Sequence, residues 1–214
     1  LTTIEQPDPR AFGAWFRRIQ GQRSGPEPIL AARCLSFLSL FRTCLDIGDF
    51  YNADLSSSNL EGLLAHYACF GFANLERTNL PGANLMGGYL YKANLQDANL
   101  WHASLSGADL RRARLRGANL DEAYLREAKL EGADLRHARL KGTMLEGADL
   151  QGANLEGADL REAKLEGADL RGAELEGTML EGTILEGADL ELITSQKPGT
   201  INEEGRFDLE VVPE

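Results

Sequence analysis

Residues 153–172 run ANLEGADLREAKLEGADLRG, four consecutive pentapeptides with alanine first and leucine third in each. The pattern extends far beyond this stretch, because every fifth residue from Phe70 to Leu190 is apolar, Phe70 being followed by 24 leucines. Of the 24 positions two residues before those leucines, nineteen hold alanine. The same register continues upstream to Phe50. An internal repeat of five residues therefore governs the fold of this chain.

A period of five fits neither an α-helix nor one long strand. Five residues advance a helix by about 140° beyond a full turn, so the leucines would spiral over every face. Side chains in a strand alternate with period two, so successive leucines would point to opposite faces. Alanine and leucine share one side of a three-residue strand only if a corner follows each leucine, and Gly107 and Gly147 suit such corners. Right-angled corners close a coil after four pentapeptides, about twenty residues.

Stacked coils would pair their short strands in parallel, about 4.8 Å apart. The repeats between positions 50 and 190 then form about seven coils and a rod roughly 35 Å tall. Leucine and alanine fill the interior in layers, and each coil touches only its neighbours. The predicted structural core includes Leu75, Leu95, Leu115, Leu135, Leu155 and Leu175.

The pentapeptides Ala-Asp-Leu-Arg-Gly at 168–172 and Ala-Asp-Leu-Glu-Leu at 188–192 resemble the A(D/N)LXX signature of the pentapeptide repeat proteins. The resemblance covers about two-thirds of the chain. It implies an all-β solenoid, a right-handed quadrilateral β-helix, whose handedness rests on the resemblance alone. It also implies a role in protein binding. Some members are similar to a DNA duplex in shape and charge and protect type II topoisomerases, and chains this regular look like those abundant in cyanobacteria.

Segments without the repeat flank the rod. We expect residues 1–48 to form an N-terminal helical cap and extension, 49–191 the β-helix, and 192–214 a C-terminal tail or cap. A cap is needed because an open solenoid leaves unpaired strand edges at its ends. Residues 28–45 are largely apolar with proline at the start, as expected for an α-helix over the first coil. In the tail, 206–212 alternates like a strand.

Trp15 and Phe16 lie in a second amphipathic stretch, 11–20, with helical spacing. The segment 21–28 reads as a flexible linker between the two helices. The stretch 11–20 therefore either packs on the body or reaches a partner, and both residues are candidates for partner binding.

The composition excludes several classes of protein. The 214 residues contain 22 Lys+Arg and 33 Asp+Glu, a formal net charge of −11, which argues against a general nucleic-acid binder. No uncharged apolar run reaches the ~18 residues that a membrane span needs. We expect a cytoplasmic location, or the thylakoid lumen or periplasm if a signal peptide was removed before Leu1.

The sequence shows no sign of catalysis. It contains no nucleophile motif, phosphate loop or dinucleotide fingerprint, and a core of leucine and alanine leaves no interior pocket. His66, His102 and His137 occupy different corners and do not form a ligand set with zinc spacing. We therefore expect no catalytic residue, no cofactor and no metal, and a protein that is not an enzyme.

Residues twenty apart should be neighbours in adjacent coils, which predicts a series of ion pairs. The opposite charges would meet at Arg111/Glu131, Arg114/Asp134, Asp121/Lys141, Arg126/Glu146, Lys129/Asp149, Arg136/Glu156, Arg139/Asp159 and Arg161/Glu181. The remaining charge is uneven. Residues 111–141 hold nine basic and five acidic side chains, net +4, whereas 142–191 hold three basic and thirteen acidic, net −10.

Like charges stack at the acidic end of the rod. Asp149, Asp169 and Asp189 precede leucines, where a carboxylate can accept hydrogen bonds from turn amides. Glu146, Glu166 and Glu186 lack that role and form a candidate acidic surface. This surface either attracts a basic partner or keeps the rod soluble.

Outward apolar residues form the other candidate surface, because exposed Tyr, Trp and Met are enriched at the centres of protein interfaces. Tyr124, Met144 and Ile184 fall on one ladder, interrupted by Lys164, whereas Tyr89, Tyr91 and Trp101 cluster near earlier corners. Scattered apolar residues are also ordinary on protein surfaces, so each group has both interpretations.

Taken together, these patterns predict a non-enzymatic scaffold or protein interaction module, such as a structural or assembly subunit of a larger complex. Its protein partners are not identified by the sequence, a homodimer stays open, and no direct nucleic-acid binding or membrane span is expected. The alternative is a DNA-mimic regulator that protects a type II topoisomerase through its acidic C-terminal coils.

Overall fold

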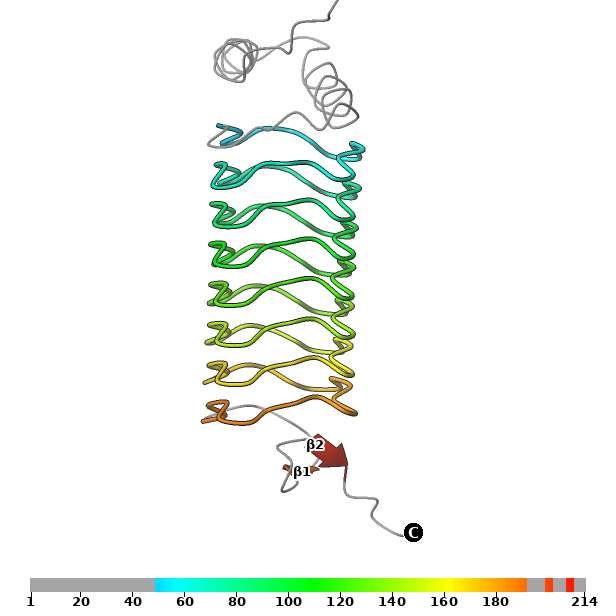
Figure 1. Cartoon of the computed structure of the whole chain (residues 1–214), viewed down its shortest axis with the longest axis vertical. Helices are drawn as coiled ribbons and strands as arrows, with labels where there is room; N and C mark the ends of the chain where they lie inside the picture. Colours follow the sequence, from blue (N-terminus) through cyan, green and yellow to red (C-terminus); the bar gives the residue numbers. More distant parts are fainter. Residues whose placement is uncertain (1–48, 192–198, 202–206, 210–214) are drawn as a thin grey trace, which may run out of the picture.

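The computed structural model describes residues 49–191, 199–201 and 207–209. Figure 1 shows residues 49–191 as coils of similar size stacked into one straight column, running from cyan to orange. Parallel bridges join residues twenty positions apart, from Asp49↔Cys69 at one end to Asp169↔Asp189 at the other. The predicted closure of a coil after four pentapeptides is therefore confirmed.

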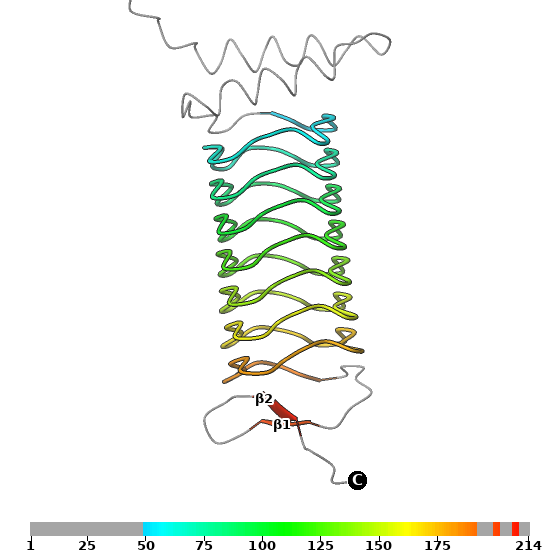
Figure 2. The same cartoon turned by 90° about the vertical axis from the view of Figure 1, so that its right-hand side faces the viewer.

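The bridged residues define four faces, and Figure 2 shows the column from the side adjacent to the view of Figure 1. Face A carries the ladder from Asp49 to Asp189, face B that from Asp54 to Glu174, face C that from Asn59 to Met179 and face D that from Leu64 to Ile184. The two residues after each leucine form the corner to the next face, so the corners are AB, BC, CD and DA.

Backbone hydrogen bonds explain why each repeat contributes only a single bridge. The Leu75 amide donates to the carbonyl of Asn94 in the next coil at 2.7 Å, whereas the Ala73 amide donates to the Phe70 carbonyl across its own corner at 3.0 Å. Because the alanine amide is used within its coil, the predicted three-residue strands are reduced to single bridges.

Every described corner uses the same backbone conformation. The second corner residue has a positive φ between 54° and 71°, whether it is one of the fifteen glycines or one of the thirteen other residues. A turn closed by a hydrogen bond between its first and fourth residues requires positive φ at its third residue if it is of type II. The glycines predicted at these corners therefore meet a real conformational demand.

The core is a continuous stack of inward side chains. The alanines and leucines of the repeat are buried as far as Leu185, with Leu75 at 1% exposure and Leu175 at 6%, whereas Ala188 and Leu190 at the end of the column are partly buried. Phe50 and Phe70 stack at one end with ring centroids 4.8 Å apart. Between the leucines from 120 to 160 the remaining space is about 10 Å³, which barely reaches the size of one water molecule.

Threonine replaces alanine at four inward positions without leaving an unpaired hydroxyl. The hydroxyls donate to leucine carbonyls 23 residues earlier, at 2.7–2.9 Å, from Thr78, Thr143, Thr178 and Thr183. These four threonine hydroxyls are thus satisfied, as burial requires, whereas the hydroxyl of Ser58, at an equivalent inward position, has no hydrogen-bond partner among the described residues.

Arginines pair mainly with an aspartate two residues earlier in the same coil, an arrangement named the aspartate–arginine clasp. The guanidinium-to-carboxylate distances are 2.6 Å for Asp109–Arg111, 2.8 Å for Asp134–Arg136, 2.6 Å for Asp159–Arg161 and 2.5 Å for Asp169–Arg171. In each clasp the carboxylate also accepts the backbone amide of its arginine. Both contacts form because the residues before and after a leucine project from the same side of the coil.

The clasps overturn most of the predicted pairing between coils. Arg126 and Glu146 form the expected pair at 2.8 Å. The predictions for Arg111, Arg136 and Arg161 are wrong, since a local aspartate offers two hydrogen bonds without spanning coils. Arg139 is likewise paired with Asp121 and not with Asp159, and Lys141 contacts Glu162 at 3.2 Å.

Outside the coils, the structure describes only a small antiparallel pair of strands. Strand β1, Gly199–Ile201, pairs with β2, Phe207–Leu209, in the register Gly199↔Leu209. Strand β2 lies within the segment 206–212 that the sequence predicts to be extended. The predicted N-terminal helices and linker, 1–48, lie outside the described residues.

Candidate protein-binding surfaces

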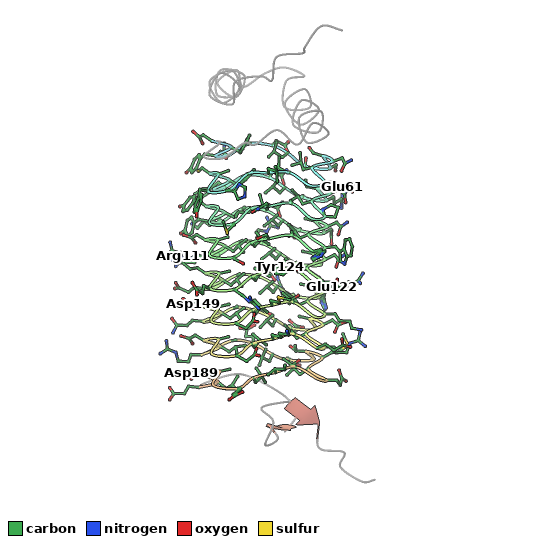
Figure 3. The ribbon with its side chains drawn as sticks, in the orientation of Figure 1. Glu61, Arg111, Glu122, Tyr124, Asp149 and Asp189 are labelled. Carbon is green, nitrogen blue, oxygen red and sulfur yellow. The ribbon has the colours of Figure 1, made fainter. Side chains whose placement is uncertain are left out.

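The outward residues of each pentapeptide are the one before its leucine and the two after it. Figure 3 shows Arg111, Asp149 and Asp189 along one edge of the column, Glu61 and Glu122 along the opposite edge, and Tyr124 between the edges. The aspartates before leucines are anchored locally, since Asp149 accepts the Gln151 amide and Asp189 the Glu191 amide, both at 3.1 Å. The predicted turn-capping role of these aspartates is confirmed.

Four aromatic side chains gather at corner AB and its border with face A, and are named the aromatic corner: Tyr51, Phe72, Tyr89 and Tyr91. Ring centroids lie 5.5 Å apart for Tyr51 and Phe72, 5.8 Å for Phe72 and Tyr91, and 6.1 Å for Tyr89 and Tyr91. Tyr51 is 49% exposed, Phe72 41% and Tyr89 38%, whereas Tyr91 is half-buried. The rings thus form one connected apolar surface across successive coils.

Gly71 lies beneath the aromatic corner and allows the rings to approach the backbone. A Cβ atom at this position would lie 2.6 Å from Cε1 of Tyr89 and 3.2 Å from Cδ2 of Tyr51. Any larger residue would therefore push at least one ring away. Rings packed in this way lose little conformational freedom when a partner binds, which favours affinity.

Two cations border the aromatic corner. The Lys92 ammonium is 5.5 Å from the Phe72 ring centroid and 5.4 Å from that of Tyr91, and the Arg111 guanidinium is 5.9 Å from the Tyr91 centroid. Burial, followed by the nearby Asp109 carboxylate, raises the pKa of the Tyr89 phenol, so its hydroxyl remains a hydrogen-bond donor at neutral pH. Tyrosine and arginine are the residue types that contribute most at protein interfaces.

The structure separates Trp101 from Tyr89 and Tyr91, with which the sequence grouped it. Trp101 lies on corner CD, diagonally opposite the aromatic corner, and its ring is 5.6 Å from that of His102, which in turn is 5.4 Å from Tyr124. A groove of about 330 Å³ beside Trp101 is lined by Asn119, Asp121, Glu122, Arg139, Lys141, Gly142 and Glu162. Its walls carry both signs of charge, so it has no single electrostatic preference.

The second predicted apolar group shares one ladder on face D. Bridges connect Tyr124 to Met144, Met144 to Lys164, and Lys164 to Ile184. All four residues are half-buried. Because Lys164 separates Met144 from Ile184, this ladder is not a continuous apolar surface.

The candidate acidic surface lies along corner DA, where Glu146, Glu166 and Glu186 follow one another in successive coils. Burial raises the pKa of Glu146, but the hydrogen bond from Arg126 and the positive charge of Lys164 outweigh it, and the pKa falls below its usual value. One oxygen of Glu146 and one of Glu166 are buried without a hydrogen-bond partner within the described part of the chain. The acidic surface therefore begins beside a cation and is not uniformly negative.

Sequence reasoning did not select Tyr51, Phe72 or Lys92. The sequence nevertheless indicates this group. Tyr51 and Tyr91 occupy one corner column forty residues apart, with Gly71 between them, and Phe72 and Lys92 are neighbours in the next column. Comparing columns twenty residues apart would have revealed the group. Trp15 and Phe16, also predicted to bind a partner, lie outside the described residues.

Within residues 49–191, 199–201 and 207–209, no three His, Cys, Asp or Glu side chains are close enough to hold a metal ion together. That part of the chain also contains no helix long and apolar enough to cross a membrane.

Comparison with protein families gives one match. A family model described as pentapeptide repeats matches in eight copies, at residues 68–100, 93–132, 118–161 and 153–191. No curated protein matches the sequence.

Several solved structures are similar to this chain. QnrB1, a plasmid-mediated fluoroquinolone resistance protein, is 20% identical, with a TM-score of 0.57 and alignment over 71% of this chain and 80% of its own. HetL, a pentapeptide repeat protein involved in heterocyst differentiation regulation from the cyanobacterium Nostoc sp. strain PCC 7120, is 28% identical over 78% of this chain and 92% of its own, with a TM-score of 0.47. Another pentapeptide repeat protein from Nostoc PCC 7120 is 38% identical over 50% of this chain and 84% of its own, with a TM-score of 0.41. The QnrB1 structure shares the fold of this chain, and at 20% identity the likeness extends to the fold alone.

Proposed function

Because the chain belongs to the pentapeptide repeat family, we propose that it is a non-enzymatic scaffold that binds a protein partner on the outer surface of its coils. Proteins of this family form right-handed β-helices and are generally structural or interaction proteins. The described coils support this assignment, since the space between their leucines is too small for a substrate.

The observation that carries the proposal is the aromatic corner. Three of its four rings are substantially exposed, the rings contact one another, and Lys92 and Arg111 lie beside them. Exposing this much connected apolar surface is unfavourable in water, and a binding partner would remove it from solvent. Each coil is supported by hydrogen bonds to its neighbours, so the site is presented on a rigid platform.

Partner capture with matched variants tests this function. The full chain, immobilised, is exposed to lysate of the source organism, and retained proteins are compared with those held by Tyr91→Ala and by Tyr67→Ala. Tyr67 is 62% exposed and belongs to corner DA, so it controls for the loss of any surface tyrosine. We expect one partner to be retained by the wild type and by Tyr67→Ala, and its affinity to fall about 30-fold with Tyr91→Ala, the effect of losing ~2 kcal/mol.

The affinity is then measured with the purified partner, and circular dichroism establishes that both variants are folded. Equal retention by all three proteins would contradict the aromatic corner as the binding site. Failure of the wild type to retain any protein would contradict the scaffold role.

The alternative role, a DNA mimic acting on a type II topoisomerase, stays a prediction that no observation favours. The acidic column at corner DA begins at the Arg126–Glu146 pair, and Lys164 contributes positive charge beside it. The cytoplasmic location, with the thylakoid lumen or periplasm as alternatives, likewise stays a prediction.

A further inference from the structure

Face B and the beginning of corner BC present two adjacent columns of side chains, one from the residue before each leucine and one from the residue after it. The columns touch in several coils: the Ser56 hydroxyl donates to Asp54 at 2.7 Å, and the Gln96 amide donates to Asn94 at 3.0 Å. The lower part of these columns is named the face B strip, and its rows are Arg114/Arg116, Asp134/Arg136, Asn154/Glu156 and Glu174/Glu176.

The clasps leave unpaired charge at both ends of the strip. Asp134, the predicted partner of Arg114, is held by Arg136 at 2.8 Å. Within the described residues, neither Arg114 nor Arg116 has a salt bridge, and the same is true of Glu174 and Glu176. All four side chains are exposed. The strip therefore has two positive charges without a salt bridge in one row and two such negative charges three coils below, where the Glu174 carboxylate accepts a hydrogen bond from the Asn154 amide.

We propose that a second copy of this chain docks on face B with its rod antiparallel to the first. The two-fold axis lies in the interface, perpendicular to the rods, between the Asp134/Arg136 and Asn154/Glu156 rows. Rotation about this axis inverts the rod but keeps the left-to-right order of the two columns. Arg114 then faces Glu174 of the second copy and Arg116 faces its Glu176, and each pair occurs twice because the interface is isologous.

The inner rows are also compatible with this axis. Arg136 faces Glu156 of the second copy, and Asp134 faces Asn154, whose side-chain amide donates one N–H to Glu174 of its own chain and has a second N–H for a carboxylate. Every row of the strip thus meets a complementary row. Along corner AB, which borders the strip, Gly132, Gly152 and Gly172 have no side chains to obstruct the approach of a second rod.

On each of the other three faces, the equivalent axis brings like charges together. Face A would oppose Arg111 to Arg171, face C would oppose Lys141 to Arg161, and face D would oppose Glu146 to Glu166. Parallel rods docked on face B would oppose Arg114 to Arg116 and Glu174 to Glu176, so this face does not favour the parallel orientation. Among these four equivalent axes, only that of face B therefore avoids contact between like charges.

The charge distribution of the whole rod supports the same orientation. Antiparallel docking brings residues 142–191 of one copy, net −10, alongside the basic band 111–141 of the other, net +4. The four rows span only about 20 Å of rod at the usual ladder spacing. An interface of this size belongs to the weak class, and its exposed ion pairs are screened by salt.

Sedimentation of the full chain with two charge-reversed variants tests the proposal. R114E/R116E makes both ends of the strip acidic, and E174R/E176R makes both ends basic, so each variant repels itself. We expect the wild type to shift toward a dimer between about 10 µM and about 1 mM at low salt, and less so at high salt. Each variant alone should lose this shift, whereas an equimolar mixture of the two should regain it at least at the wild-type level.

The control variant is E122R/E181R, which makes the same change in net charge as E174R/E176R on corner CD, and it should not mix productively with R114E/R116E. A monomeric wild type at ~1 mM and low salt, or a mixture that stays monomeric, would overturn the proposal. Dimerisation of R114E/R116E alone, or of E174R/E176R alone, would also overturn the proposal. Tyr91→Ala should leave self-association intact, so this result is independent of the aromatic corner and of the proposed function.

Discussion

At the scale of single residues, the second corner position is the most constrained part of the backbone. Gly152 has φ of 62°, and no atom lies within 4 Å of the place where a Cβ would stand. Other residues adopt the same angle, for example Glu127 at 56° and Lys92 at 55°. Their left-handed conformation costs free energy that the stacked hydrogen bonds of the corner offset.

Replacing Gly152 with alanine isolates this backbone cost, because the added methyl group meets no neighbour. We expect Gly152→Ala to reduce the free energy of unfolding by about 1 kcal/mol, measured by urea denaturation. Gln151→Ala, one residue earlier at the same corner and exposed, should change it by less than about 0.5 kcal/mol. Equal stability of the two variants would show that these corners tolerate side chains without strain.

At the scale of the structural element, the aspartate–arginine clasp stabilises a corner and adds a dependence on pH. Hydrogen bonds from the arginines lower the pKa of Asp109, Asp134, Asp159 and Asp169, more than partial burial raises it. A carboxyl group whose pKa is lower in the folded state than in the unfolded state stabilises the fold above the unfolded value, about 3.9. This stabilisation is lost as pH falls through the lower, folded value.

Denaturation from pH 7 to pH 2 tests the contribution of the clasps. The wild type should keep its stability down to about pH 4 and lose it progressively below. A variant with asparagine at the four clasp aspartates keeps the acceptor for the turn amide but has no carboxylate, so it should show a shallower loss below pH 4. Arg136→Gln, which removes a guanidinium and leaves its carboxylate, should reduce the dependence in the same direction. If both variants lost stability below pH 4 as steeply as the wild type, the clasps would not be the source of this pH dependence.

At the scale of the whole molecule, the column converts position along the chain into position around the rod. A shift of five residues moves every later side chain to the next face, whereas the inward pattern of alanine and leucine is unchanged. The core is therefore the same whichever face an outward residue occupies. The composition of each outer surface, in contrast, changes with every such shift.

Deleting residues 143–147 uses this property. The junction Lys141-Gly142-Ala148-Asp149-Leu150 continues the repeat, but Glu174 moves from face B to face A and Glu176 from corner BC to corner AB. We expect the shortened chain to keep its β-helical circular dichroism and to lose the concentration-dependent association seen in sedimentation. Deleting only 143–145 breaks the inward pattern and should cost several kcal/mol of stability through exposed leucines and unfilled core. Wild-type association in the five-residue deletion would contradict the face B interface.

The sequence by itself determined the coil, its twenty-residue register, the inward leucines and the need for unusual backbone at the corners. These features follow from a strict period, because only one path places Leu75, Leu95 and every equivalent residue inside. The tertiary structure alone decided how the outer side chains associate. Arg139 pairs with Asp121, eighteen residues away, Lys141 with Glu162, twenty-one away, and Arg136 with Asp134, two away. On the surface of a stacked coil all these neighbours lie within reach of a long side chain, so local geometry and not the period selects the partner.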